Sequence, residues 1–139
     1  MTSLEIETIL KYGKSITKAP YTWWIEGNTT YENPYPHYIN KLPTKAYLMK
    51  YGVNCAGFIN LLLLKIGKDV KGSGKYIGGT TIWIKYFKEN DMLKPFDYNQ
   101  KYPLGTLIFR NYKNPKDQGH VAVLYSYSKK DELKNKILH

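Results

Sequence analysis

Residues 52–66 read Gly-Val-Asn-Cys-Ala-Gly-Phe-Ile-Asn-Leu-Leu-Leu-Leu-Lys-Ile, and this stretch decides the fold. Asn54 is a favourable N-cap residue, and Gly67 follows as a natural helix end, so the stretch predicts a helix that runs from Cys55 to Ile66. Its apolar residues cover nearly the whole circumference, which means that other elements must surround it. We therefore expect a buried central helix that carries Cys55, the only cysteine of the chain, in its first turn.

The position of Cys55 has chemical consequences. Unpaired backbone N–H groups in the first turn of a helix favour a thiolate over a thiol, and a thiolate is a nucleophile. A base is available downstream, where residues 119–124 read Gly-His-Val-Ala-Val-Leu and predict a strand that carries His120. A cysteine and a histidine on different elements are the minimal pair for nucleophilic catalysis.

The rest of the chain predicts an α+β domain. Thr2 and Glu5 have capping-box spacing before a helix over residues 3–12 that Gly13 would end. We expect an extended aromatic segment at 19–25, an irregular loop at 27–43 that includes His37, and a helix from Thr80 or Thr81 to about residue 89. Three strands should follow at 106–111, 119–127 and 136–139. Nothing in the sequence divides the chain, so we expect one domain over residues 1–139.

The last two strands allow a prediction of register. A turn centred between Lys129 and Lys130 would place His120 directly opposite His139 in an antiparallel hairpin. Directly opposed side chains have Cβ atoms about 4.5 to 5.5 Å apart, so one imidazole would orient the other.

Composition narrows the function classes. The net charge of +10 favours anionic partners, but Arg110 is the only arginine among 21 basic residues, so nucleic-acid binding is an unlikely main role. The apolar run at 56–66 is shorter than the roughly 20 residues that span a bilayer. One cysteine and an acidic, amphipathic N-terminus without a secretory pattern lead us to expect an intracellular protein. The sequence predicts no metal or organic cofactor, and it does not indicate an oligomeric state.

Five stretches resemble, in order, the motifs of NlpC-type cell-wall peptidases, which are cysteine hydrolases of the papain-like superfamily. That family typically has Tyr-x-Trp-Gly, Gly-x-Asp-Cys-Ser-Gly at a helix start, Pro-Gly-Asp-Leu before a strand, a Gly-His-Val-Gly strand, and a further strand that ends in a polar residue, commonly His. The matching stretches are Pro-Tyr-Thr-Trp at 20–23, Gly-Val-Asn-Cys-Ala-Gly-Phe at 52–58, Leu-Gly-Thr-Leu-Ile-Phe at 104–109, Gly-His-Val-Ala-Val at 119–123 and Lys-Ile-Leu-His at 136–139.

The resemblance implies a papain-like fold, in which the helix that bears the nucleophile packs on an antiparallel sheet. It implies a peptidase or amidase with Cys55 as nucleophile, His120 as general base and His139 as the group that orients His120. Tyr21, Trp23 and Asn54 would serve the oxyanion or bind the peptide or acyl-amide substrate. The chain departs from the family at Asn54, where Asp is usual, and at Ala56, Trp24 and Thr106, where Ser, Gly and Asp are usual.

Other interpretations stay open at this point. A papain-like acyltransferase or thioesterase would use the same cysteine and histidine with a different acceptor. An alternative from another class is an inactive basic module that binds anionic polymers or nucleic acid. Cys55 alone would ordinarily be a small buried core residue, and zinc binding by Cys55, His120 and His139 has no supporting motif spacing.

Overall fold

The structure is a computed structural model of the 139-residue chain, and it describes residues 1–27, 29–30, 35–71, 77–127 and 135–138. Its elements are α1 (Ser3–Ile16), α2 (Lys45–Tyr51), α3 (Cys55–Lys65), α4 (Thr80–Glu89), β1 (Leu107–Arg110), β2 (His120–Tyr127) and β3 (Asn135–Leu138). The three strands form one antiparallel sheet in the order β1-β2-β3. Helices before a small antiparallel sheet make this an α+β protein, as the sequence predicts.

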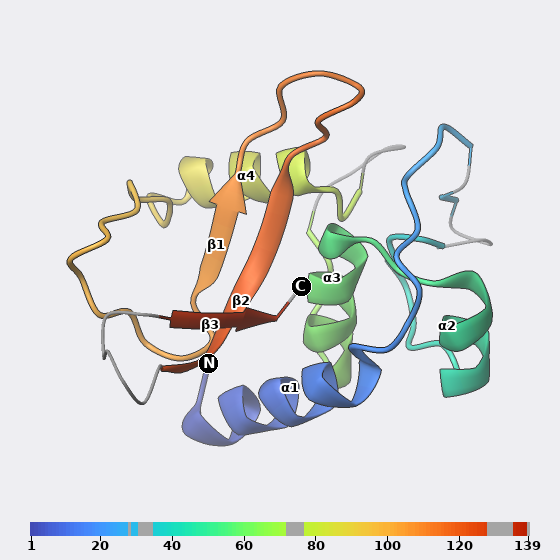
Figure 1. Cartoon of the computed structure of the whole chain (residues 1–139), viewed down its shortest axis with the longest axis horizontal. Coiled ribbons are helices and arrows are strands. Elements are labelled where there is room, and N and C mark those ends of the chain that lie inside the picture. The colour runs from blue at the N-terminus through green and yellow to red at the C-terminus, as the bar shows by residue number, and fades with distance from the viewer. Residues whose placement is uncertain (28, 31–34, 72–76, 128–134, 139) are drawn as a thin grey trace.

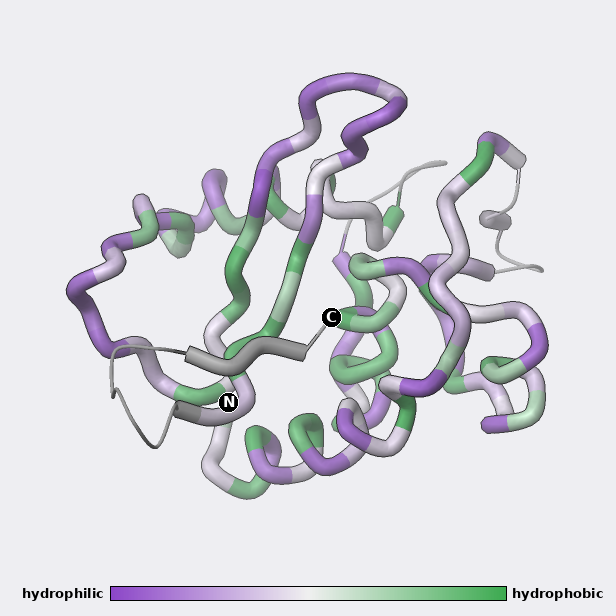
Figure 2. The backbone as a smooth tube through the Cα atoms, in the orientation of Figure 1, coloured by the Kyte–Doolittle hydropathy of each residue, from purple (hydrophilic) through white to green (hydrophobic). Residues whose placement is uncertain are grey.

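α3 occupies the centre of the molecule (Figure 1), where it contacts both α1 and β2. Every residue from Cys55 to Leu62 is buried. Figure 2 shows the reason, since α3 and the inner parts of the strands are the most continuous hydrophobic stretches of the backbone. Val121 and Val123 of β2 pack in the same core cluster as Phe58, Leu61 and Leu62 of α3. This packing holds the start of α3 beside β2.

The other helices cover the remaining sides. α1 runs along one end of α3, and its predicted capping box is confirmed, with Glu5 and Thr2 each bonding to the backbone of the other. α4 crosses behind β1 and β2 in the view of Figure 1, and the rings of Phe87 and Phe109 lie 5.6 Å apart between their centroids. Among the described helices, none has the length and apolar character needed to cross a bilayer.

Two helices differ from the prediction. α1 does not end at Gly13 but continues to Ile16, because Gly13 and Ile16 are both buried against the core, and this packing outweighs the helix-ending tendency of glycine. The sequence analysis also missed α2. This helix of seven residues buries only Leu48, so it leaves no periodic apolar pattern; its local signals are the N-cap Thr44 and Gly52 at its end.

The predicted register of the last hairpin is wrong for the described residues. Val123 pairs with Leu138 and Tyr127 pairs with Asn135, whereas a turn between Lys129 and Lys130 would pair Val123 with Lys136. The pairing also shifts between Leu124 and Ser126, which indicates a bulge in β2. An extra residue in one strand leaves no trace in the alternation of side chains that we used to set the register. His139, for which the pairing with His120 was predicted, lies outside the described residues.

Candidate active site

Cys55 is the first residue of α3. Asn54 precedes it in an extended conformation, and its side-chain oxygen accepts a hydrogen bond from the backbone N–H of Gly57 at 2.7 Å. The predicted N-cap is therefore confirmed. The cap holds the first turn in place and leaves the Cys55 side chain directed toward β2 and the aromatic segment, with 6% of the residue exposed.

The side chain of His120 lies beside the thiol of Cys55, close enough to lower its pKa. They meet because α3 packs against β2 and His120 is the first residue of that strand. Burial alone would raise the pKa of the thiol. Hydrogen bonds from the His120 side chain and from the backbone N–H of Val121, together with the charge of His120, outweigh burial and lower the pKa of Cys55 to about 7.

Tyr21 is the third group that acts on the sulfur, since its side chain contributes to lowering the pKa of Cys55. A short parallel bridge brings it there. The backbone N–H of Thr22 donates to the carbonyl of Val53, and the N–H of Val53 donates to the carbonyl of Pro20. Burial and the adjacent Cys55 thiolate raise the pKa of Tyr21, so its hydroxyl stays protonated and remains a hydrogen-bond donor to the sulfur.

Cys55 borders a cleft of about 380 Å³. Four segments wall it: the aromatic segment, the start of α3, the start of α4, and the connection between β1 and β2. Trp23 is 56% exposed and packs edge-on against Tyr21, with 5.3 Å between ring centroids, so it stands at the mouth. The side chains and backbone that line the cleft belong to Tyr21, Trp23, Trp24, His37, Asn54, Cys55, Ala56, Gly79, Thr80, Thr81, Ile82, Tyr112, Pro115, Gln118 and Gly119.

The start of α4 faces the thiol. The Thr80 hydroxyl lies 3.9 Å from the Cys55 sulfur, and Gly79, the N-cap of α4, provides no side-chain hydrogen bond to the first turn. The first turn of α4 therefore lines the cleft without a side-chain cap on its backbone N–H groups. Thr80 and Thr81, where the sequence predicted the start of this helix, lie within its first turn, and Gly79 is the N-cap.

Asn60 joins the cleft walls to α3. Its amide nitrogen donates to the backbone carbonyls of His37 at 2.7 Å and Gly78 at 3.0 Å, and its oxygen accepts from the indole N–H of Trp83 at 2.7 Å. Asn60 is wholly buried. The loop before α2, the turn before α4 and α4 itself are therefore all fixed to the helix that carries Cys55.

Sequence reasoning missed Asn60, Thr80 and His37. Asn60 left a detectable signal, since one amide within an otherwise apolar helix must find buried partners. His37 left none, because it lies in a stretch rich in Pro, Tyr and Asn that reads as an exposed loop. In the structure it is 4% exposed and lines the cleft.

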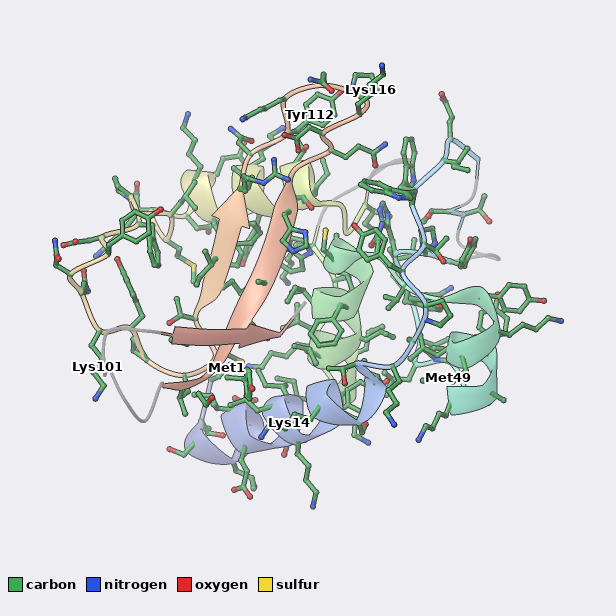
Figure 3. All side chains as sticks on the ribbon, in the orientation of Figure 1. Met1, Lys14, Met49, Lys101, Tyr112 and Lys116 are labelled. Carbon is green, nitrogen blue, oxygen red and sulfur yellow. The ribbon has the colours of Figure 1, made fainter. Side chains whose placement is uncertain are left out.

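The connection between β1 and β2 forms the outer wall, and Figure 3 labels Tyr112 and Lys116 on it. An ion pair between Arg110 and Asp117 closes the base of this connection. Figure 3 also labels Lys14 and Lys101, which lie far from this connection. Within the part of the chain that the structure describes, no three His, Cys, Asp or Glu side chains are placed to hold a metal ion.

Comparisons of the chain with protein-family models, with curated proteins and with solved structures find no match.

Proposed function

We propose that this protein is a cysteine hydrolase of papain-like type that cleaves an amide bond through Cys55 and His120. One observation carries the proposal: a cysteine in the first turn of a buried helix lies beside a strand histidine that lowers its pKa, and it borders a cleft. A structural thiol has no need of this arrangement, since burial without partners would keep it protonated and inert. The order of the motifs that resemble NlpC-type peptidases is a second, independent support.

The mechanism follows from the positions of these groups. The Cys55 thiolate attacks the carbonyl carbon of the scissile amide, and the C=O π electrons move to the oxygen to form a tetrahedral oxyanion. The backbone N–H of Cys55, at the start of α3, stabilises that oxygen, together with the Tyr21 hydroxyl. Protonated His120 gives its proton to the leaving amine, so the C–N bond breaks and a thioester remains.

Hydrolysis of the thioester uses the same residues in reverse roles. Neutral His120 takes a proton from a water molecule, whose oxygen attacks the thioester carbonyl. Collapse of the second tetrahedral intermediate breaks the C–S bond, releases the carboxylic acid and regenerates the Cys55 thiolate beside protonated His120. Apart from the substrate and water, every reacting group in these steps belongs to the chain.

Alkylation of the thiol against pH tests the thiolate directly, because Cys55 is the only cysteine. In the native protein, the rate of modification by iodoacetamide should reach half its maximum near pH 7. In His120→Ala the effect of the imidazole is lost while burial and the bond from Val121 stay, so the midpoint should move upward, toward the ordinary thiol value of 9.0. A thiol that reacts only after unfolding would contradict the proposal, and so would a midpoint that is the same in the native protein and in His120→Ala.

Turnover provides the second test. Release of amine from peptidyl aminocoumarins and from peptidoglycan stem peptides should be lost in both Cys55→Ala and His120→Ala, by a factor of at least about 10³. Lys116→Ala is the matched control, since it alters the exposed tip of the outer connection without touching the reacting groups. Both catalytic variants should keep the far-ultraviolet circular dichroism of the native chain. Residual activity in a folded Cys55→Ala variant would exclude the mechanism.

A further inference from the structure

Thr80 has a hydroxyl group that the proposed mechanism does not use. The residue is the first of α4, is 7% exposed and lines the cleft. Its hydroxyl oxygen lies 3.9 Å from the sulfur of Cys55, a distance at which the large sulfur atom still forms a hydrogen bond. Among the residues that the structure describes, this hydroxyl has no other hydrogen-bond partner. A buried hydroxyl needs a partner, so the sulfur is the atom that satisfies it.

The direction of this hydrogen bond depends on the state of the sulfur. A neutral thiol can donate to the Thr80 oxygen or accept from it, whereas a thiolate has no proton and can only accept. The proposed mechanism requires the thiolate, so in the reactive state the Thr80 hydroxyl is the donor. Hydrogen bonds to a charged acceptor are shorter and stronger than those between neutral groups, so the contact should tighten when Cys55 ionises.

The side chain of Asn60 fixes Thr80 relative to the nucleophile. Its amide nitrogen donates to the carbonyl of Gly78, two residues before Thr80, and its oxygen accepts from the indole N–H of Trp83, three residues after it. Asn60 lies on α3, as Cys55 does. The hydroxyl and the sulfur are thus both held by the same buried helix, as a preorganised donor requires.

We propose that Thr80 is a further catalytic residue, whose hydroxyl donates a hydrogen bond to the Cys55 thiolate and stabilises this charge in its buried position. The inference rests on the proposed function. His120 and Tyr21 act on the sulfur from β2 and from the aromatic segment, whereas Thr80 acts from α4. α4 is therefore a part of the catalytic machinery as well as a wall of the cleft.

The titratable groups around the sulfur and its cleft come, among the described residues, from elements other than α4. They are His120 of β2, Tyr21 of the aromatic segment, His37 of the cleft wall and Arg110 of β1. None of them is altered when the side chain of Thr80 is replaced, and Thr80 itself does not titrate. A change in the pH dependence of Cys55 in a Thr80 variant therefore measures the effect of the lost hydroxyl.

Alkylation by iodoacetamide tests the proposal with matched variants. The thiolate displaces iodide and forms a thioether, and the rate belongs to one sulfur, because Cys55 is the only cysteine. Thr80→Val removes the hydroxyl but keeps the shape of the side chain, whereas Thr80→Ser keeps the hydroxyl. Thr81→Val is the control, since Thr81 is exposed and lines the same cleft. None of these variants removes a helix cap, because the N-cap of α4 is Gly79.

In Thr80→Val the midpoint of the rate against pH should rise by about 0.5–1 pH unit relative to the native protein. The maximum rate at high pH should stay the same or rise up to about threefold, because a less stabilised thiolate is a stronger nucleophile. Thr80→Ala should shift the midpoint in the same direction, which makes the result independent of how valine packs. Thr80→Ser and Thr81→Val should keep the native midpoint.

The failure of this inference can be told apart from the failure of the proposed function. A midpoint that stays at the native value in Thr80→Val and Thr80→Ala would overturn the role of Thr80, even if His120→Ala raises it. A shift of equal size in Thr80→Ser would also overturn that role, because the hydroxyl would not be its cause. If the native thiol is inert to iodoacetamide near pH 7, the proposed function itself fails, and the role of Thr80 fails with it.

Discussion

Cys55 and His37 are both buried beside one cleft, and burial favours the neutral form of each. For Cys55, hydrogen bonds from His120 and Val121 outweigh burial, so a substantial fraction of the thiol is ionised near pH 7. For His37, a hydrogen bond to the backbone of Ile77 does not outweigh burial, so the imidazole stays neutral. At the residue scale, the partners of each group therefore decide its charge.

The neutral state of His37 predicts a loss of stability in acid. The unfolded chain binds a proton at His37 near pH 6.5 and the folded chain only near pH 4, so stability falls as pH decreases between these values. Between pH 7.5 and pH 5 this residue should account for about 2 kcal/mol of the lost free energy of unfolding. Urea unfolding at both pH values should show a smaller pH effect in His37→Gln. An equal pH effect in both proteins would show that His37 is protonated when folded.

Removing the Asn60 side chain should destabilise the protein strongly. Asn60→Ala would leave the indole N–H of Trp83 and the carbonyls of His37 and Gly78 buried without their partner, which predicts a loss of about 3–5 kcal/mol in urea unfolding. Asn90→Ala is the control, because it removes one exposed hydrogen bond to Tyr86 and should cost less than about 1 kcal/mol. Similar losses in the two variants would mean that the buried bonds of Asn60 contribute little.

At the scale of elements, local signals were read correctly from the sequence. The capping box of α1, the Asn54 cap of α3 and the positions of β1 and β2 depend on residues close together in the chain. Features set by contacts between distant segments were not predicted correctly. The extension of α1 beyond Gly13 depends on burial of Ile16, the β2-β3 register depends on a bulge, and His37 reaches the cleft only because Asn60 holds its backbone.

The start of α3 should not tolerate a side chain at Gly57. A Cβ there would overlap the backbone carbonyl oxygen of Pro36, and that segment cannot move away without disturbing His37. Gly57→Ala should therefore cost at least about 3 kcal/mol in thermal or urea unfolding. Gly67→Ala is the comparison, because a Cβ at that position meets nothing within 4 Å. The positive φ of 71° alone should lower the free energy of unfolding of this variant by about 1–2 kcal/mol. A Gly57→Ala variant as stable as the native protein would disprove this close packing.

At the scale of the whole molecule, the charge of +10 predicts attraction to polyanions without selectivity. The single arginine is paired with Asp117, so it is not free to contact a base edge. A 20-base-pair DNA should bind with a dissociation constant of about 1–100 µM near physiological salt, with little dependence on base sequence. Binding much tighter than this, with a marked preference for one base sequence, would favour the alternative of a nucleic-acid-binding module.

The attachment of the cleft walls has a consequence for evolution and for engineering. The wall that contains His37 is anchored by buried bonds to Asn60, whereas the outer wall at 111–119 is closed by an ion pair with solvent access. Mutational drift should accumulate at Tyr112, Pro115 and Gln118, while Asn60 and Gly57 remain constant. Mutant libraries that aim at new substrate selectivity are best directed to the outer wall, because the inner wall is anchored to the same helix that carries the nucleophile.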